Sequence, residues 1–304
     1  MIHSRERCNF AASRYLSSDV SRPKRDRITK EAPMLEQLRL RLNRKMLRTI
    51  RRYSLLQEGD RVMVAVSGGK DSYTLLELLA SARARLPFNF EIIAVHLDQG
   101  QPGYDGRPLE GWLEESGIPF EILRQDTYSV VMRVTGGEGT FCAPCARLRR
   151  GALYSAAERL SCNKIALGHH RDDTIETLLM NLFYSGRIQA MPAGYQTNDG
   201  RFEVIRPLIE CGEADIASYA ALRDFPILPC NLCGSQSGLK RERMKQLLST
   251  LESEIPDLRD VMLASLRNVN PTHLLDRELL DRVQTGEPLE SERPEEGALI
   301  QIEG

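Results

Sequence analysis

The chain has 304 residues, of which 41% are hydrophobic and 27% are charged, and its formal net charge is −1. This composition favours a globular protein. No apolar run reaches the ~18 residues of a membrane span, and the N-terminal sequence lacks the apolar core of a secretory signal. Seven cysteines, an odd number, argue against a secreted disulfide scaffold. We therefore expect a cytoplasmic protein that is not inserted in a membrane.

Charge is distributed unevenly along the chain. Residues 1–52 carry fifteen Lys and Arg against five Asp and Glu, whereas residues 274–304 carry nine acidic residues against three arginines. Residues 1–33 are polar and aperiodic, so we expect a disordered basic arm there, and an acidic tail over residues 276–304. A basic arm can bind nucleic acid by neutralising phosphates, or it can be a solvated tail. Composition leaves both interpretations open.

The first expected helix starts at Met34. Apolar residues recur at helical spacing from Leu35 to Ile50 among many arginines, which predicts an amphipathic basic helix in the region 34–60. Signals for strands and helices then alternate. Strands are expected at 62–66, 90–96, 119–123 and 164–167. Helices are expected at 71–84, 107–116, 146–160 and 171–185.

This alternation predicts an α/β fold over residues 61–210, with a doubly wound parallel sheet and helices on both of its faces. In such folds ligands bind beyond the carboxyl ends of the strands. Residues 211–275 have a mainly helical pattern, and we expect them to form a C-terminal addition to this domain.

The strand at 62–66 ends in the sequence SGGKDS, residues 67–72. Adjacent glycines let the backbone adopt positive φ and approach a ligand closely. The next helix, expected to start near Asp71 or Ser72, directs unpaired N–H groups and the positive end of its dipole at the loop. Such a loop binds an anion, usually phosphate, although it is neither a Walker A loop nor Gly-x-Gly-x-x-Gly. The alternative is a Gly-rich turn without a ligand.

The motif resembles the PP-loop of the ATP pyrophosphatase superfamily, whose members cleave ATP between the α and β phosphates to adenylate a substrate. The resemblance implies that reaction type and a nucleotide site made by Ser67, Gly68, Gly69, Lys70, Asp71 and Ser72. Lys70 offers a positive charge to phosphate. Asp71 would repel phosphate, so it either begins the helix or binds Mg²⁺.

Two further strand ends match this superfamily. Its members commonly contact adenine with backbone groups at the end of the second strand, which here implies Val95, His96 and Leu97. The pattern Gly-His-x-x-Asp-Asp follows the fourth strand, at Gly168, His169, Asp172 and Asp173.

The two carboxylates of this pattern open a helix, so capping alone can explain one of them. A second acid beside a phosphate site is better explained by metal binding or by positioning of the nucleophile. His169 either contacts nucleotide or caps the strand. The candidate catalytic residues are Lys70, Asp71 and Asp173.

Two Cys-x-x-Cys pairs, Cys142 with Cys145 and Cys230 with Cys233, lie 85 residues apart. Thiolates at this spacing can hold one soft metal ion or cluster. Zinc bound by four sulfurs is the first interpretation from spacing, and a redox dithiol or accidental spacing is the alternative for a single pair. The other cysteines are expected to be structural or incidental, namely Cys8, Cys162 and Cys211.

In order along the chain, the motifs SGGKDS, LDQGQPG, CAPCARLRRG, LGHHRDD and PCNLCGSQ resemble the tRNA 2-thiocytidine biosynthesis (TtcA) family from about Leu35 to His273. The resemblance implies a homodimeric, ATP-dependent tRNA thiolase that places sulfur on cytidine 32 of the anticodon loop. It also implies Mg²⁺, a sulfur donor such as a cysteine desulfurase, and a [4Fe–4S] cluster completed by the region 211–275. The implied cluster ligands are Cys142, Cys145 and Cys233, with Cys230 as the alternative third ligand.

Two other functions stay open. A PP-loop thiolase could act on another tRNA base with a zinc Cys₄ site, or a zinc-bearing RNA-binding protein could have lost catalysis. The intact SGGKDS and GHHRDD motifs argue against the second. A nitrogen-transferring ligase of the lysidine or amidation type would not need the cysteines. Three arginines after the first cysteine pair can guide an RNA backbone or form a solvated helix face: Arg147, Arg149 and Arg150.

Overall fold

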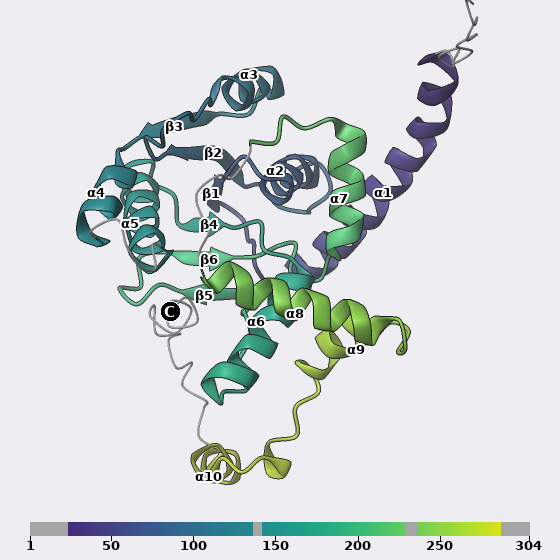
Figure 1. Cartoon of the computed structure of the whole chain (residues 1–304), viewed down its shortest axis with the longest axis vertical. Helices are drawn as coiled ribbons and strands as arrows, with labels where there is room; N and C mark the ends of the chain where they lie inside the picture. The colour runs from purple at the N-terminus through teal and green to yellow at the C-terminus, as the bar shows by residue number, and fades with distance from the viewer. Residues whose placement is uncertain (1–23, 136–141, 229–235, 287–304) are drawn as a thin grey trace, which may run out of the picture.

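A computed structural model describes residues 24–135, 142–228 and 236–286, and it contains a six-stranded sheet (Figure 1). The strands are β1 (Arg61–Ala65), β2 (Glu91–Asp98), β3 (Phe120–Arg124), β4 (Lys164–Ala166), β5 (Gly194–Gln196) and β6 (Glu203–Ile205). Their order is β3-β2-β1-β4-β6-β5, and every neighbouring pair is parallel except β5 with β6. The predicted α/β fold with a mainly parallel sheet is confirmed.

The described residues form ten α-helices, some of which cover the two faces of the sheet. They are α1 (Lys24–Arg52), α2 (Lys70–Ala82), α3 (Arg107–Ser116), α4 (Thr127–Thr135), α5 (Cys142–Arg159), α6 (Arg171–Met180), α7 (Glu213–Arg223), α8 (Gln236–Glu252), α9 (Leu258–Ser265) and α10 (Arg277–Thr285). A π-helical turn η1 (Asn181–Ser185) continues α6, and a short 3₁₀ turn η2 (Pro271–His273) precedes α10. In Figure 1, α1, α2 and α7 lie on one side of the sheet and α4 and α5 on the other. Of the helices described, none is both long and apolar enough to cross a membrane.

Alternate residues of the central strand enter separate cores, because successive side chains of a strand point to opposite faces. Val62 and Val64 are buried in the core under α1, α2 and α7, whereas Met63 is buried in the core under α5. A third apolar cluster joins α6, α8 and α9 through Ile175, Leu179, Met180, Met244, Leu248 and Leu258. This cluster fixes α8 against α6, beside the carboxyl ends of the strands.

The structure differs from the sequence predictions at several elements. Helix α1 begins at Lys24, ten residues before Met34, because a polar segment with a proline inside the helix has no apolar period to reveal it. The strands β5 and β6 and the helix α4 were not predicted. Each of these two strands has three residues, too few to show alternation. The proposed arm upstream of residue 24 and the tail beyond residue 286 lie outside the described residues and stay predictions.

Candidate nucleotide and cluster site

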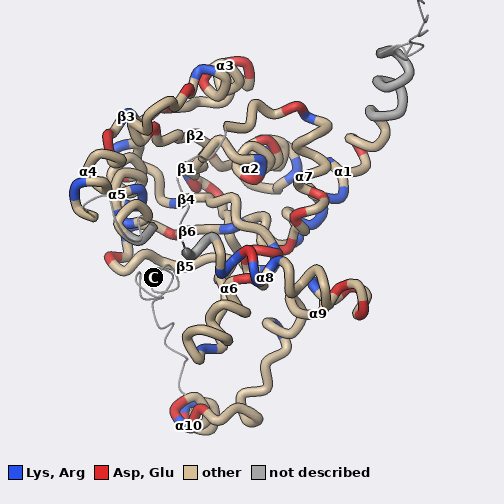
Figure 2. The backbone as a smooth tube through the Cα atoms, in the orientation of Figure 1, with Lys and Arg blue, Asp and Glu red and all other residues tan. Residues whose placement is uncertain are grey.

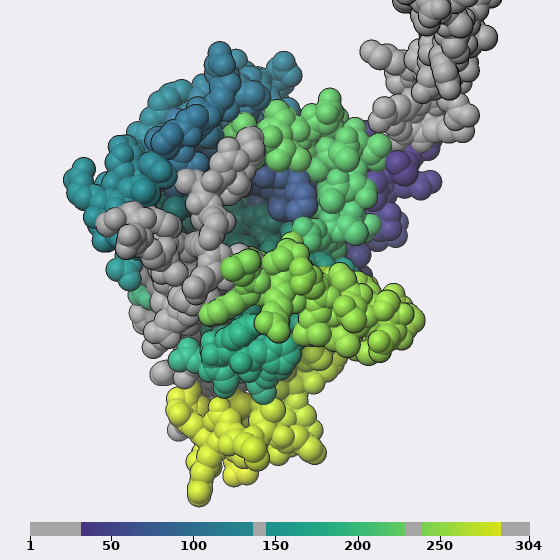
Figure 3. All heavy atoms as spheres, viewed as in Figure 1, coloured from purple at the N-terminus to yellow at the C-terminus, as the bar shows by residue number. Residues whose placement is uncertain are grey.

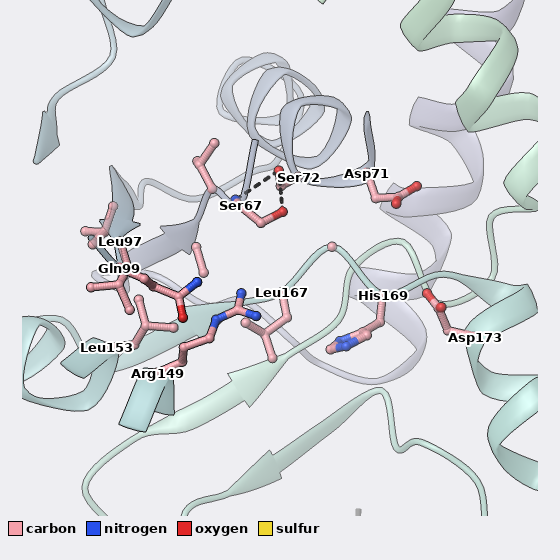
Figure 4. Close-up of a pocket in the computed structure, with 14 residues that line it drawn as sticks. Ser67, Asp71, Ser72, Leu97, Gln99, Arg149, Leu153, Leu167, His169 and Asp173 are labelled. Atoms are coloured by element: carbon pink, nitrogen blue, oxygen red, sulfur yellow. Dashed lines mark hydrogen bonds between the residues drawn. The ribbon is translucent and has the colours of Figure 1, made fainter. Parts of the chain in front are cut away.

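A cleft of about 290 Å³ opens at the carboxyl ends of β1, β2 and β4, where parallel α/β folds bind ligands (Figure 4). Fourteen residues from these strand ends, α2, α5 and α6 line it: Ala65, Val66, Ser67, Asp71, Ser72, Val95, Leu97, Gln99, Arg149, Leu153, Leu167, Gly168, His169 and Asp173. Motifs that are spread over about a hundred residues of the sequence thus meet around one cavity. Its volume is near the lower end of ligand pockets, ~300–1,000 Å³.

The SGGKDS loop is held in shape by its own serines. The Ser72 hydroxyl accepts from the Ser67 backbone N–H at 3.1 Å and donates to the Gly69 carbonyl at 2.9 Å (Figure 4). Gly68 has a φ of +84°, which other residues rarely adopt. Helix α2 begins directly after Gly69, so its N-terminus faces the loop. The result is a preformed anion site at the end of β1.

The loop is also packed against the segment that leads to the second cysteine pair. The Leu228 N–H donates to the Gly68 carbonyl at 3.0 Å, and a Cβ on Gly68 would come within 2.8 Å of the Leu228 side chain. Cys230, which follows Leu228 by two positions, lies outside the described residues, as does Cys233. The last described residue before the second cysteine motif is therefore in contact with the phosphate loop.

The first cysteine pair reaches the same cleft from α5. The Cys145 thiol lies 3.3 Å from Oε1 of Gln99, and Gln99 lines the cleft. Arg149, one helical turn after Cys145, lines it too. Cys142 is the first residue of α5. The first cysteine pair thus adjoins the cleft through Cys145, and the described segment before the second pair contacts the phosphate loop.

Two carboxylates, Asp71 and Asp173, face the cleft next to the phosphate loop (Figure 4). Asp71 Oδ1 is buried without a hydrogen bond among the described residues. Asp173 accepts from the backbone N–H of His170 in a capping box at the start of α6. Burial would raise the pKa of Asp173, but His170 and Arg241 lower it overall. Two carboxylates, one with an oxygen that accepts no hydrogen bond among the described residues and lies 3.6 Å from His170 Nε2, offer the donor chemistry that Mg²⁺ prefers.

Lys70 is ion-paired beside the cleft rather than lining it. Its ammonium lies 3.0 Å from Glu213 Oε1 and 3.2 Å from Asp71 Oδ2. Burial lowers the pKa of Lys70, but these carboxylates outweigh it and raise the pKa overall. The amine is therefore charged at neutral pH.

Comparison with known proteins places this site in a family. Residues 38–227 match the PP-loop domain family. A relative from Anaeromyxobacter sp. (strain K), named tRNA-cytidine(32) 2-sulfurtransferase, is 51% identical over 243 residues, which cover 79% of this chain and 84% of the relative. A relative of the same name from Paracidovorax citrulli is 48% identical over 265 residues, with 87% and 84% covered. The chain belongs to this sulfurtransferase family. The family membership that the sequence motifs indicated is confirmed.

A solved structure has the same fold as this sulfurtransferase-family chain. It is the U34-tRNA thiolase NcsA from Methanococcus maripaludis with its [4Fe–4S] cluster. The TM-score is 0.62, the sequence identity is 22%, and the match covers 78% of this chain and 81% of NcsA. This likeness shows that the PP-loop fold extends over most of the chain.

Two candidate residues of the sulfurtransferase-family motifs have structural partners instead of lining the cleft. The buried His96 ring donates from Nδ1 to the Val66 carbonyl at 2.7 Å, so its Nε2 accepts from the Tyr104 hydroxyl. The buried Asp172 carboxylate accepts from the Glu213 N–H at 2.8 Å and from Arg259 at 2.8 Å. A direct nucleotide contact by either side chain stays a prediction, although the neighbours Val95 and Leu97 do line the cleft.

Sequence reasoning missed some lining residues and one buried cation. Gln99 lies in the LDQGQPG motif directly after β2, and this place at a strand end was the available signal. Arg149 was considered only as an RNA contact or a solvated residue. Arg206, 2% exposed, lies under the cleft, where its Nε donates to His169 Nδ1 at 3.2 Å. Nothing in the local sequence marks that arginine as buried.

This arginine sets the proton position on His169. Because a guanidinium only donates, Nδ1 must accept, and the neutral ring then carries its proton on Nε2. Burial, followed by the charge of Arg206, lowers the pKa of His169 to about 3. His169, which lines the cleft, is therefore a neutral hydrogen-bond donor across the physiological pH range.

We expect the His169 ring to show no protonation between pH 8 and about 5, because its lowered pKa lies well below that range. Nitrogen NMR of histidine-labelled protein measures this directly. Arg206→Met should raise the His169 pKa part of the way towards its ordinary value, since burial remains. The matched control is Arg201→Met, which lies just before β6 whereas Arg206 directly follows it, and which should leave His169 unchanged. A wild-type ring that titrates near its ordinary pKa would contradict the assignment.

Glu176 gives the protein a separate pH dependence. Its fully buried carboxylate has no hydrogen bond among the described residues, and burial raises its pKa to about 7 despite Lys245 at 3.9 Å and Arg241 at 3.7 Å. The folded state then holds a proton that the unfolded state has lost above its ordinary pKa. The free energy of unfolding should therefore fall between the ordinary pKa and about pH 7, by up to about 3 kcal/mol.

Glu176→Gln should abolish this fall, so that wild type loses stability relative to the variant as the pH rises to about 7. Denaturant unfolding at several pH values measures the difference. Glu242→Gln on α8, an exposed carboxylate, is the control and should follow wild type. If Glu176→Gln also runs parallel to wild type at every pH, the proposed buried protonation is wrong.

Proposed function

We propose that this chain is an ATP-dependent tRNA thiolase that converts cytidine 32 of the anticodon loop to 2-thiocytidine. Its sulfurtransferase relatives are named for that base. The observation that carries the proposal is that Cys145 reaches the nucleotide cleft and that the described segment before the second cysteine pair contacts its phosphate loop. Leu228 packs on Gly68 of the phosphate loop, and the Cys145 thiol lies against Gln99 of the cleft wall. ATP chemistry and sulfur chemistry can then meet at one base.

ATP would occupy the cleft with its phosphates on the loop of residues 67–72 and the N-terminus of α2. Backbone groups at Val95 and Leu97 lie where adenine would contact the end of β2. Mg²⁺ would be held by Asp71 and Asp173, because Asp71 Oδ1 is buried without a hydrogen bond among the described residues. Lys70 would leave Glu213 for phosphate and stabilise the charge that develops as pyrophosphate departs.

The cluster ligands would be Cys142, Cys145 and Cys233, with Cys230 as the alternative third ligand. Cys145 is part-buried beside the cleft, and the segment before Cys230 contacts the phosphate loop, so the donor set fits a cluster at the cleft margin. When bound by three thiolates, a [4Fe–4S] cluster keeps one iron open to an external sulfide, which a closed Cys₄ zinc site does not.

The reaction would proceed in two steps. The C2 oxygen of cytosine attacks the α-phosphorus of ATP, the α–β phosphoanhydride bond breaks, and pyrophosphate leaves. Sulfide then attacks C2, the C2–oxygen bond breaks, and AMP leaves with that oxygen. Sulfide would come from a donor such as a cysteine desulfurase. His169 can donate from Nε2 to an oxygen of the adenylate, and Arg149 can balance its negative charge. We expect a homodimer acting in the cytoplasm.

Reconstitution tests this function. Anaerobically purified protein is incubated with an unmodified tRNA transcript, ATP, Mg²⁺ and sulfide, and the tRNA nucleosides are analysed by mass spectrometry. We expect 2-thiocytidine that requires ATP and disappears when cytidine 32 is replaced by uridine. Thiolation of another base would support the thiolase chemistry but contradict the assignment of cytidine 32 as the target. Tight tRNA binding by a zinc-containing protein without any thiolation would favour a non-catalytic RNA-binding protein.

A further inference from the structure

Large apolar side chains are exposed together where α6 ends. Leu182 is 45% exposed, Phe183 53%, Tyr184 47% and Ile188 68%. Figure 3 shows the end of α6 and η1 open to solvent between α8 and α10. Single exposed apolar residues are common, but a run of them within seven positions marks an interaction site.

The backbone of residues 181–189 is held by hydrogen bonds, while its large apolar side chains are exposed to solvent. The helix changes from α to π at Asn181, and π turns occur frequently at functional sites. Asn181 is buried, and its side-chain amide donates to the Gln189 carbonyl at 2.8 Å. The Arg187 N–H donates to the Asn181 carbonyl at 3.1 Å, and Gly186 closes the turn with a φ of +63°. The exposed aromatic rings therefore project from a fixed turn.

Positive charge surrounds the rings. The Lys240 ammonium lies 5.2 Å from the centre of the Tyr184 ring, and Arg187 follows the turn directly after Gly186. Residues 236–250 contain four Lys and Arg against the single acid Glu242. Figure 2 shows Lys and Arg on α8 beside α6. Aromatic faces interleaved with cations are the composition of single-stranded nucleic-acid sites.

A continuous set of contacts joins this surface to the nucleotide cleft. Asp173, which lines the cleft, lies 3.7 Å from Arg241, the residue next to Lys240. Asp173 also lies ten residues before Phe183 along α6 and its π-helical continuation, about 15 Å along the axis. A single-stranded segment of a few nucleotides can therefore place one base in the cleft and bases a few positions away on the exposed rings.

We propose that Leu182, Phe183, Tyr184, Arg187, Ile188 and Lys240 form a platform for the unpaired bases of the tRNA anticodon loop. The inference rests on the proposed thiolase function and names the surface that presents the loop. Bases a few positions from the target stack on Phe183 and Tyr184, and Arg187 and Lys240 contact their phosphates. RNA fits better than a second copy of the chain, because a dimer contact would have to bury these cations against each other.

Equilibrium binding of an unmodified tRNA transcript at several salt concentrations tests the platform. Phe183→Ala and Tyr184→Ala should each weaken binding about 5- to 100-fold without changing its salt dependence, since stacking releases no counterions. Lys240→Ala and Arg187→Ala should instead reduce the slope of log affinity against log salt by about 0.7–1 each. Phe183→Tyr should retain affinity, whereas Phe183→Leu should not, because leucine keeps apolar area but loses the ring face.

Light scattering and ATP binding on the same variants complete the test. The platform predicts an unchanged oligomeric state, unchanged ATP affinity and an unchanged melting temperature. Unaltered tRNA affinity in both Phe183→Ala and Tyr184→Ala would overturn the platform. The proposed thiolase function would still stand if the wild type thiolates tRNA. A shift of Phe183→Ala to a smaller species, with tRNA affinity unaltered, would assign the surface to a second copy. Failure of the wild type to bind tRNA would overturn both proposals.

Discussion

Cys145→Ala should lose its iron and lower thiolation at least ~100-fold, more than the loss expected for groups that only support metal ligands. The thiol lies at the cleft wall, 3.3 Å from Gln99, where sulfur chemistry has to meet the nucleotide. Cys142→Ala should behave in the same way, because a cluster that retains two protein ligands is poorly held. Iron analysis and thiolation assays of anaerobically purified variants measure both effects.

The chain supplies its own controls for this prediction. Cys162 and Cys211 are buried, and burial raises the pKa of both thiols, that of Cys211 to about 12, so neither offers a thiolate. Cys162→Ala should keep its iron. In the second pair, Cys233→Ala should lose the cluster while Cys230→Ala keeps much of it. Equal losses in all four motif variants, with zinc in the wild type, would instead support a closed zinc site.

Lys70→Ala should lower the rate of thiolation ~100- to 1,000-fold, the effect of removing one preorganised donor to developing charge. The fold should tolerate the change, because Lys70 lies at the start of α2 and contacts carboxylates rather than the apolar core. The cluster should also remain, since the variant removes no thiolate. Single-turnover thiolation with ATP measures the loss, and iron content confirms that the cluster is intact.

Lys245→Ala is the matched control for Lys70. Lys245 also pairs with Glu213, at 3.4 Å, but it projects from α8 and does not belong to the phosphate loop. Both variants free Glu213 from one cation, so their melting temperatures should change by similar amounts. Only Lys70→Ala should cause the ~100- to 1,000-fold loss of activity. Equal activity in the two variants would show that Lys70 does not serve phosphate.

The central part of the fold could be predicted from the sequence because the alternation of strand and helix signals is strong there. Helix α3 matches its predicted range of residues 107–116, and the first four strands match to within two residues. Buried parallel strands are short apolar runs, and the glycines of SGGKDS mark where the first of them ends. The short antiparallel pair β5 and β6 was missed because its strands are defined by pairing with the sheet rather than by their own pattern.

The candidate site was partly predictable for a similar reason. Residues at strand ends share one edge of a parallel sheet, so the grouping of Ser67, Val95 and Gly168 follows from topology. The contact of Leu228 with Gly68 depends on how the chain returns after α7, which no local pattern encodes. The hydrogen bond from Arg206 to His169 likewise joins residues 37 positions apart. Long-range packing decides these features.

The fate of the cytosine C2 oxygen tests the adenylation mechanism most directly. A tRNA carrying ¹⁸O at C2 of cytidine 32 is thiolated with ATP and sulfide, and the released AMP is analysed by mass spectrometry. Attack of that oxygen on the α-phosphorus predicts ¹⁸O in the phosphate of AMP, with one labelled AMP for each 2-thiocytidine formed. Unlabelled AMP, or ADP and phosphate as the products, would contradict adenylation of the base.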